Sequence, residues 1–412
     1  MSQKKWNVAI GFATGRKNFY RILRSYVLNC LESGLLDNKD VGLNLFVAYD
    51  LEYRHTSKAD FVAINPEISK LLDSVHFIGK SEMLIEKKNM LKRGIITEAE
   101  AKVIFRRGYA LQRNIILYKA IENHMDCLLF LDDDEYPVAL TKSIETDLWG
   151  GQRVIQSHLK YIKDADITCG HHCGYISPIP YVEFSHAFPE DIFKKFIQSL
   201  SNDIINWDTI RSVMKNGGVT YADKQILLRK EVKTVQDING AKFISGSNLC
   251  INLQNPKRVF PFYNPPGARG EDTFLSTCLT ERKVLQIPCY TFHDGFGAYR
   301  YMLAGVLPVR MKMIRADSSR VLKRFYTACI GWIRYKPLYI YITDREHYRS
   351  RIAEMTESLE KTLPFICRYF KSDMFMMVLR ELKKYDNTID KQYTYFENNK
   401  LIWSRLLKTL QE

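Results

Sequence analysis

The segment Cys127-Leu-Leu-Phe-Leu-Asp-Asp-Asp-Glu-Tyr-Pro137 decides how the rest of the chain is interpreted. Five consecutive apolar residues are typical of a strand buried on both faces of a parallel sheet. The three carboxylates that follow repel one another and lose hydration, an arrangement that persists when a divalent cation or a positive ligand compensates it. Asp132 and Asp134 point to the same side of an extended chain, so both can reach a hard cation and the phosphates it carries. A solvated acidic turn or a helix cap is the alternative.

Strand-like and helix-like patterns alternate before this segment. Short apolar runs predict strands, and amphipathic stretches between them predict helices. The predicted strands are 6–12, 41–49 and 75–78, and the predicted helices are 18–31 and 109–120, with a charged, helix-prone stretch at 81–107. This alternation indicates an α/β fold with a mostly parallel central sheet flanked by helices, and a site at the carboxyl ends of its strands.

After the aspartates the pattern is less regular. The sequence predicts a helix at about 139–162, strands at 166–170, 241–253 and 284–287, and a helix from 271 to about 281. Residues 80–107 and 181–240 look like insertions into this pattern of strands and helices. A Pro- and Gly-rich loop covers 255–270.

Length and charge indicate one large domain with a second module. The chain has 412 residues and a net charge of +14, and residues 306–412 carry 21 Lys and Arg against 12 Asp and Glu. We therefore expect a domain over 1–305, with halves at about 1–137 and 138–305, and a basic, aromatic-rich helical region over 306–412. The charge indicates an anionic partner, which could be nucleic acid, a nucleotide phosphate or a lipid headgroup.

Cysteine usage and the N-terminus favour a cytoplasmic protein. The nine cysteines are scattered and odd in number, which predicts free thiols in a reducing compartment. Residues 1–15 fit neither a signal peptide nor a transit peptide, and no apolar run is long enough to cross a membrane.

Two further motifs contain acids or a histidine. In Gly267-Ala-Arg-Gly-Glu-Asp-Thr-Phe-Leu275, Glu271 and Asp272 fall in the predicted first turn of a helix, where the macrodipole favours negative charge. They are either a catalytic pair or ordinary first-turn acids. His293, after the last predicted strand, is either a ligand for the same cation or a structural histidine.

Basic and Cys/His segments complete the candidates. Thr14 and Arg16 follow the first strand, where loop amides and a guanidinium can hold a nucleotide. Arg113 and Asn114 lie on the helix before the aspartate strand. The run Cys169-Gly-His-His-Cys173 contains zinc's preferred ligands, but no second pair at finger spacing accompanies it, so His171 and His172 are expected to line a pocket or to pack.

In order and spacing, these motifs resemble those of the nucleotide-sugar-dependent glycosyltransferases of the GT-A fold, and among them family 2. That family has a Thr-containing loop after its first strand, an Asp after its second, Ala-Arg-Asn on a helix, an Asp-Xaa-Asp metal motif, a later Glu-Asp pair and sometimes a late His. The positions that match here are Thr14, Asp50, Arg113 with Asn114, Asp132 with Asp134, Gly246, Glu271 with Asp272, and His293. Gln112 stands where the family has Ala.

The resemblance implies a metal-dependent, inverting transfer of a sugar to a hydroxyl acceptor. Asp134 would hold Mn²⁺ or Mg²⁺ with Asp132 and His293. Asp272 would act as the base, and Glu271 would bind the acceptor or the donor sugar. The implied donor-binding residues are Thr14, Arg16, Asp50, Arg113, Asn114, Asp132, Asp133 and Gly246.

The partner implied by the resemblance is a nucleotide-sugar donor, with a glycan or lipid-linked acceptor of bacterial surface polysaccharide. Basic residues and aromatics in 306–412 suit a membrane surface at its inner face, although aromatics at helical spacing are equally typical of a core. A sugar-phosphate nucleotidyltransferase and a nonenzymatic nucleic-acid-binding protein are the alternatives, but no nucleic-acid-binding motif is present.

Overall fold

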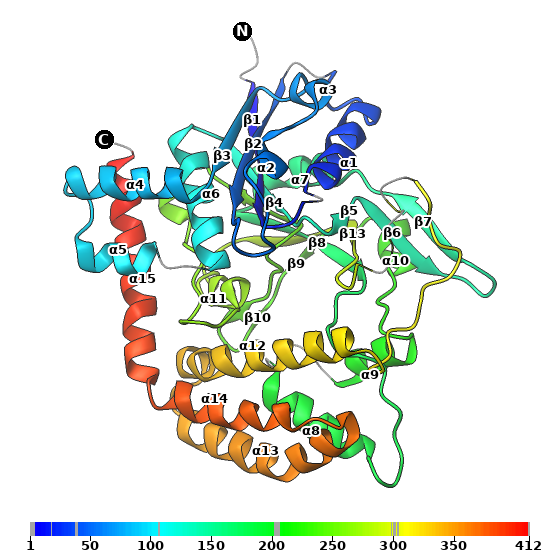
Figure 1. Ribbon diagram of the computed structural model, residues 1–412. Coiled ribbons are helices and arrows are strands. Elements are labelled where there is room, and N and C mark those ends of the chain that lie inside the picture. Colours follow the sequence, from blue (N-terminus) through cyan, green and yellow to red (C-terminus); the bar gives the residue numbers. More distant parts are fainter. Residues whose placement is uncertain are drawn as a thin grey trace.

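The computed structural model describes residues 5–17, 19–37, 40–105, 108–201, 207–297, 299, 302 and 305–410. Asn18, with which the first predicted helix begins, lies outside these residues, as do 106–107 and 202–206 in the two predicted insertions. The architecture is α/β, with a central sheet, helices around it and a C-terminal helical region (Figure 1). The α/β class and the C-terminal helices are thus confirmed.

The central sheet is mixed. Its path is β3-β2-β1-β4-β12-β8-β13-β5, with β9 paired to β13. The first four strands are parallel, whereas β12 is antiparallel to both β4 and β8. The strands are β1 (Trp6–Thr14), β2 (Val41–Tyr49), β3 (Ser74–Ile78), β4 (Cys127–Leu131), β5 (Glu135–Tyr136), β8 (Ile167–Gly174), β9 (Lys233–Thr234), β12 (Leu249–Asn252) and β13 (Val284–His293).

The expected parallel pairing therefore applies to the N-terminal strands and to β8 with β13, whereas β5, β9 and β12 pair antiparallel. All five residues of β4 are buried, as expected for a strand covered on both faces. An antiparallel strand begins at the edge where its parallel neighbours end. The loop before β12 therefore reaches the same edge of the sheet as the aspartates after β4.

Several of the predicted elements were wrong in type or extent, and two of them change the topology. Residues 139–162 are not one helix, because β6 (Val138–Lys142) and β7 (Asp147–Gly151) form a hairpin, and only α7 (Val154–Tyr161) is α-helical. Each strand of the hairpin has only five residues and no regular alternation of buried and exposed positions, so its pattern does not distinguish it from a helix. The predicted strand 241–253 is divided into β11 (Ala241–Lys242), which pairs with β10 (Asp237–Ile238), and β12.

Helices cover the sheet and form a separate layer beyond its edge. Those near the sheet are α1 (Phe19–Glu32), α2 (Ala59–Val62), α3 (Pro66–Ser69), α4 (Lys80–Lys92), α5 (Glu98–Ile104), α6 (Tyr109–Glu122), α7 and α11 (Glu271–Ser276). The others are α8 (Glu190–Leu200), α9 (Trp207–Lys215), α12 (Ser319–Thr343), α13 (Tyr348–Phe370), α14 (Met377–Asp386) and α15 (Ile389–Thr409), whereas α10 (Lys224–Arg229) lies against β13 of the sheet. In α1 the buried residues recur at helical spacing, from Phe19 to Cys30.

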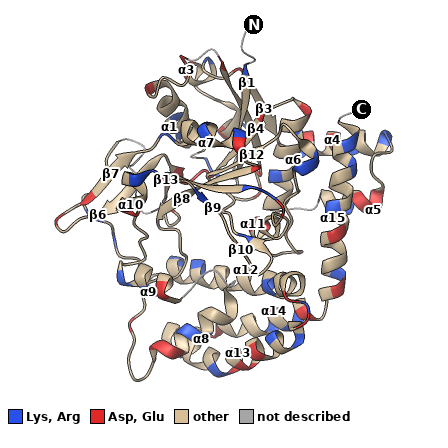
Figure 2. Ribbon diagram, turned by 180° about the vertical axis from the view of Figure 1, so that it is seen from behind, with Lys and Arg blue, Asp and Glu red and all other residues tan. Residues whose placement is uncertain are grey.

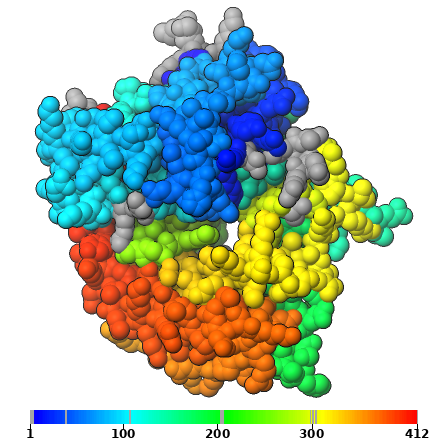
Figure 3. Space-filling view, viewed as in Figure 1, coloured from blue at the N-terminus to red at the C-terminus, as the bar shows by residue number. Residues whose placement is uncertain are grey.

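The C-terminal helices share their hydrophobic core with earlier parts of the chain. Phe325 of α12 contacts Phe193 and Phe196 of α8, and Tyr263 contacts Phe396 of α15. At the other end of α15, the Trp403 indole N–H donates to the Val259 carbonyl at 3.0 Å. Helices α12, α13 and α14 therefore form a continuous layer with α8, and α15 leads from this layer to the sheet half of the molecule (Figures 1 and 3).

The C-terminal aromatic residues are mostly part of this core. Tyr335, Tyr339, Phe370, Phe375 and Trp403 are all buried. Basic and acidic residues are interspersed along α13, α14 and α15 (Figure 2). Within the described ranges, no helix has the length and apolarity needed to cross a membrane. All nine cysteines are unpaired, as the sequence predicted.

Candidate functional site

The acidic segment after β4 is neutralised by basic side chains of the protein itself. Asp132 Oδ1 lies 3.1 Å from Nη2 of Arg113. Nη1 of Arg16 lies 2.6 Å from Asp133 Oδ1 and 2.5 Å from Asp134 Oδ2. The Thr14 hydroxyl donates to the other oxygen of Asp133. The predicted donor-loop residues and the acidic triplet are thus in direct contact.

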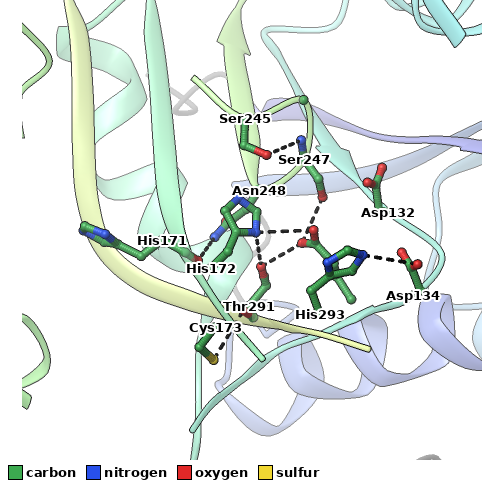
Figure 4. Close-up of polar contacts among 12 residues, drawn as sticks. Asp132, Asp134, His171, His172, Cys173, Ser245, Ser247, Asn248, Thr291 and His293 are labelled. Carbon is green, nitrogen blue, oxygen red and sulfur yellow. Dashed lines mark hydrogen bonds and ion pairs between the residues drawn. The ribbon is translucent and has the colours of Figure 1, made fainter. Parts of the chain in front are cut away.

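His293 faces Asp134 from the end of β13. Its Nε2 atom lies 3.2 Å from Asp134 Oδ2 (Figure 4). Burial opposes the charged imidazole, but the Asp134 carboxylate more than offsets this and raises the pKa of His293 to about 9. Burial would raise the pKa of Asp134, yet His293 and Arg16 hold it well below its usual range. The sequence placed both residues in one site, and the structure brings them together.

A second acid–histidine pair lies next to the first. Burial would raise the pKa of Glu135, but His172, 3.3 Å away, and nearby groups lower it to about 2. The same carboxylate accepts hydrogen bonds from Ser247 at 3.0 Å and Thr291 at 2.7 Å (Figure 4). Sequence reasoning missed Glu135, Ser247 and Thr291. The available signal was that Glu135 directly continues the acidic run.

The neighbouring histidine, His171, has a different environment. Side chains alternate along β8, so His171 and His172 lie on opposite faces of the strand. The His171 ring stacks on Tyr290, with ring centroids 5.0 Å apart, and points away from the acidic cluster (Figure 4). His171 therefore packs against the sheet face, whereas His172 belongs to the site.

Arg113 connects the acidic triplet to the Glu271 loop. In addition to its contact with Asp132, Nη1 donates to the carbonyl of Gly246, and Nε lies 3.9 Å from Glu271 Oε1. Its guanidinium lies over the rings of Phe130 and Phe262. A Cβ at Gly246 would lie 3.0 Å from Nη2, which is tighter than ordinary packing. Arg113 is therefore buried at the junction of three segments.

Glu271 and Asp272 begin α11, as the sequence predicted, although the helix ends at Ser276, not near 281. Gly270, which precedes them, has φ of 100°, and a Cβ there would lie 3.0 Å from the ring of Tyr335. Burial and the neighbouring Glu271 raise the pKa of Asp272 to about 6. A carboxylate with this pKa is suited to accept a proton near neutral pH.

Two predicted donor-binding residues have structural partners. The Asn114 amide donates to the Phe262 carbonyl at 2.8 Å and accepts from the Phe262 N–H at 2.7 Å, so it clamps the loop that leads to α11. Asp50 lies at the end of β2, where its N–H donates to the Thr14 carbonyl and its carboxylate accepts from the Glu52 N–H. Asp50 is exposed at the predicted edge of the sheet.

The ligand atoms at this site partly fit a divalent cation. Asp134 Oδ2 and His293 Nε2 are an oxygen and a nitrogen ligand 3.2 Å apart, as two neighbouring ligands of one ion are. Asp132 instead contacts Arg113, and across the described ranges no three His, Cys, Asp or Glu side chains converge on one point. The described residues therefore offer one oxygen and one nitrogen ligand to a cation at this point.

Comparison with known proteins adds no assignment, because no protein-family model matches the sequence and no curated protein is significantly similar to it. The geometry of the site is therefore the basis for any functional conclusion.

Proposed function

We propose that this protein transfers a sugar from a nucleotide-diphosphate sugar to a hydroxyl acceptor, with Mn²⁺ or Mg²⁺ and with inversion at the anomeric carbon. The observation that carries the proposal is the pairing of Asp134 with His293 at the carboxyl edge of the parallel strands. Ligands bind at this edge in open α/β sheets. The resemblance to family 2 of the GT-A fold supports the choice of reaction.

In this proposal Asp134 and His293 hold the divalent cation, whose charge would stabilise the diphosphate as it leaves. Thr14, Arg16 and Asp50, on the loops after β1 and β2, face the nucleotide. Glu271, held by Arg113, binds the donor sugar or the acceptor. These roles use residues that the structure places around one edge of the sheet.

Asp272 is the proposed base. The acceptor oxygen bonds to the anomeric carbon while the bond from that carbon to the diphosphate oxygen breaks, and Asp272 takes the hydroxyl proton. Its pKa of about 6 leaves it deprotonated at neutral pH yet able to accept a proton. The proposed acceptor is a glycan or a lipid-linked glycan.

A thermal-shift panel tests this function. Nucleoside diphosphates and nucleotide sugars, each with and without Mn²⁺, should raise the melting temperature, and one base should be preferred. Asp134→Ala should abolish the Mn²⁺-dependent part, whereas Asp208→Ala, on α9, should not. Retention of the full Mn²⁺ effect in Asp134→Ala would contradict the proposal. Formation of nucleoside triphosphate from a nucleotide sugar and pyrophosphate would indicate a nucleotidyltransferase instead.

A further inference from the structure

Arg324 is a charged side chain for which the described part of the chain provides no carboxylate partner. It lies in the second turn of α12, in the C-terminal helical layer. Its Nε atom is buried and makes no hydrogen bond, and no carboxylate of a described residue lies within ion-pair distance of its guanidinium. Arg324 is half-buried, and a half-buried cation without a carboxylate partner is costly, so such a group is expected to meet an anion in the working protein.

The guanidinium of Arg324 is held in a fixed position. It stacks over the ring of Phe296, with Cζ 4.3 Å from the ring centroid. A Cβ at Gly295 would clash with its Nη2 atom, so the guanidinium lies directly against the loop that follows His293. Its orientation is therefore set before any ligand arrives, which lowers the entropic cost of binding.

The charged groups that face Arg324 come from four segments. They are Asp134, Asp294, Arg16 and Arg269. Burial and the two arginines lower the pKa of Arg324 to about 10, so it remains charged at neutral pH. Asp134 is already paired with Arg16 and His293, and Asp294 accepts a hydrogen bond from the Tyr299 N–H at 3.1 Å. The nearest carboxylates therefore have other partners.

Arg269 extends this positive region along α12. It is exposed on the loop before Gly270, its guanidinium lies 6.0 Å from the ring centroid of Tyr109, and its side chain reaches the helix at Gly331. In the space-filling view the N-terminal segment and the start of the C-terminal layer meet around a narrow opening (Figure 3). Arg16 follows β1 of the sheet, Arg324 belongs to α12, and Arg269 lies on the loop before α11, against α12.

We propose that Arg324, assisted by Arg269, is a diphosphate-binding residue that the C-terminal layer contributes to the site. The nature of the ligand rests on the proposed function. Arginine suits this role, because its planar fork can donate two hydrogen bonds to phosphate oxygens. The diphosphate could belong to a nucleotide or to a lipid-linked acceptor, and the two sources are separable by experiment.

The test compares binding of two diphosphates. Affinities of the best nucleoside diphosphate from the thermal-shift panel and of farnesyl diphosphate are measured by calorimetry for wild type, Arg324→Gln, Arg324→Lys and Arg269→Gln. Loss of a charge-assisted hydrogen bond should weaken binding about tenfold or more in Arg324→Gln, and less in Arg324→Lys. Lys323→Ala, an exposed neighbour on α12, is the matched control and should bind as wild type does. The matching nucleoside, which has no phosphate, should bind all variants equally.

Each outcome decides the proposal. Weaker nucleoside diphosphate binding assigns Arg324 to the donor, and weaker farnesyl diphosphate binding alone assigns it to the acceptor. Unchanged binding of both ligands in Arg324→Gln and Arg269→Gln overturns the proposal. If no nucleoside diphosphate binds the wild type, the proposed function fails, and inorganic pyrophosphate then tests Arg324 by the same comparison. Arg269→Gln keeps the test valid if Arg324→Gln does not fold, because Arg269 is exposed.

Discussion

The guanidinium of Arg16 lies 2.5 Å from the carboxylate of Asp134, the residue proposed to bind a divalent cation. The acidic triplet therefore carries an internal counter-charge. Arg16 and His293 both contact Oδ2 of Asp134. A metal ion bound to this oxygen would therefore compete with Arg16. The sequence indicated a divalent cation or a positive ligand as compensation for these carboxylates, and the structure shows that part of this charge comes from the chain itself.

Removing Arg16 should strengthen metal binding and destabilise the metal-free protein. In Arg16→Gln, Asp133 and Asp134 lose their counter-charge, so the melting temperature in EDTA should fall and the increase caused by Mn²⁺ should be larger than in wild type. Lys17→Gln, an adjacent and largely exposed residue, is the control. An equal Mn²⁺ effect in Arg16→Gln and wild type would show that Arg16 and the ion do not compete.

Asp272 should give the reaction an acid limb. Because its pKa is about 6, the carboxylate is protonated below that pH and cannot accept the acceptor proton, so turnover should rise with pH through about 6. Asp272→Asn should lower kcat by about 10² to 10⁴ while nucleotide binding is retained. Normal turnover in Asp272→Asn would exclude Asp272 as the base.

Asn114 should contribute mainly to stability. Asn114→Ala removes both hydrogen bonds to the backbone of Phe262 and leaves its buried N–H without an acceptor, whereas its carbonyl keeps the Asn399 amide as a donor. The free energy of unfolding should fall by about 1 to 3 kcal/mol, as measured by urea denaturation. Gln112→Ala, on the same helix, should have a smaller effect. If Asn114→Ala reduces donor affinity without a loss of stability, the donor-binding role implied by the resemblance is the better one.

Phe325 should be essential to the core that joins α8 to the C-terminal helices. Its ring is fully buried and contacts Phe193, Phe196 and Phe375. Phe325→Ala should cost about 3 to 5 kcal/mol, measured by denaturant unfolding with both near-UV and far-UV circular dichroism. Leu401→Ala, at a residue that is 68% exposed, should change little. Unfolding of the C-terminal helices alone in Phe325→Ala would show that they are a separate unit.

The sequence predicted the N-terminal half of the fold well. Strands there are continuous apolar runs, such as β4, and β1 is followed by a helix with a clear buried face, α1. The prediction failed where periodicity is short. The β6–β7 hairpin was taken for a helix, and the antiparallel β12 could not be distinguished from a parallel strand, because pairing direction leaves no local pattern.

The candidate site was predicted in part for the same reason. Motifs at strand ends, such as Asp134 and His293, could be grouped because parallel strands place their carboxyl ends together. Glu135 and Ser247 meet only through β5 and β12, which were not foreseen. Arg324 comes from a helix that contacts the site through tertiary packing, and spacing along the sequence contains no information on such a contact.

Helix α12 touches both ends of the site. Arg324 lies near Asp134, and Tyr335 packs against Gly270, just before Asp272. Arg324 and Tyr335 are eleven positions apart on α12, which is about three helical turns and about 16 Å along the helix axis. Both side chains therefore project from the same face of the helix. A tilt or slide of α12 would move both side chains together. In the proposed mechanism Arg324 contacts the leaving diphosphate and Asp272 accepts the proton. Movement of this one helix would therefore change both contacts together.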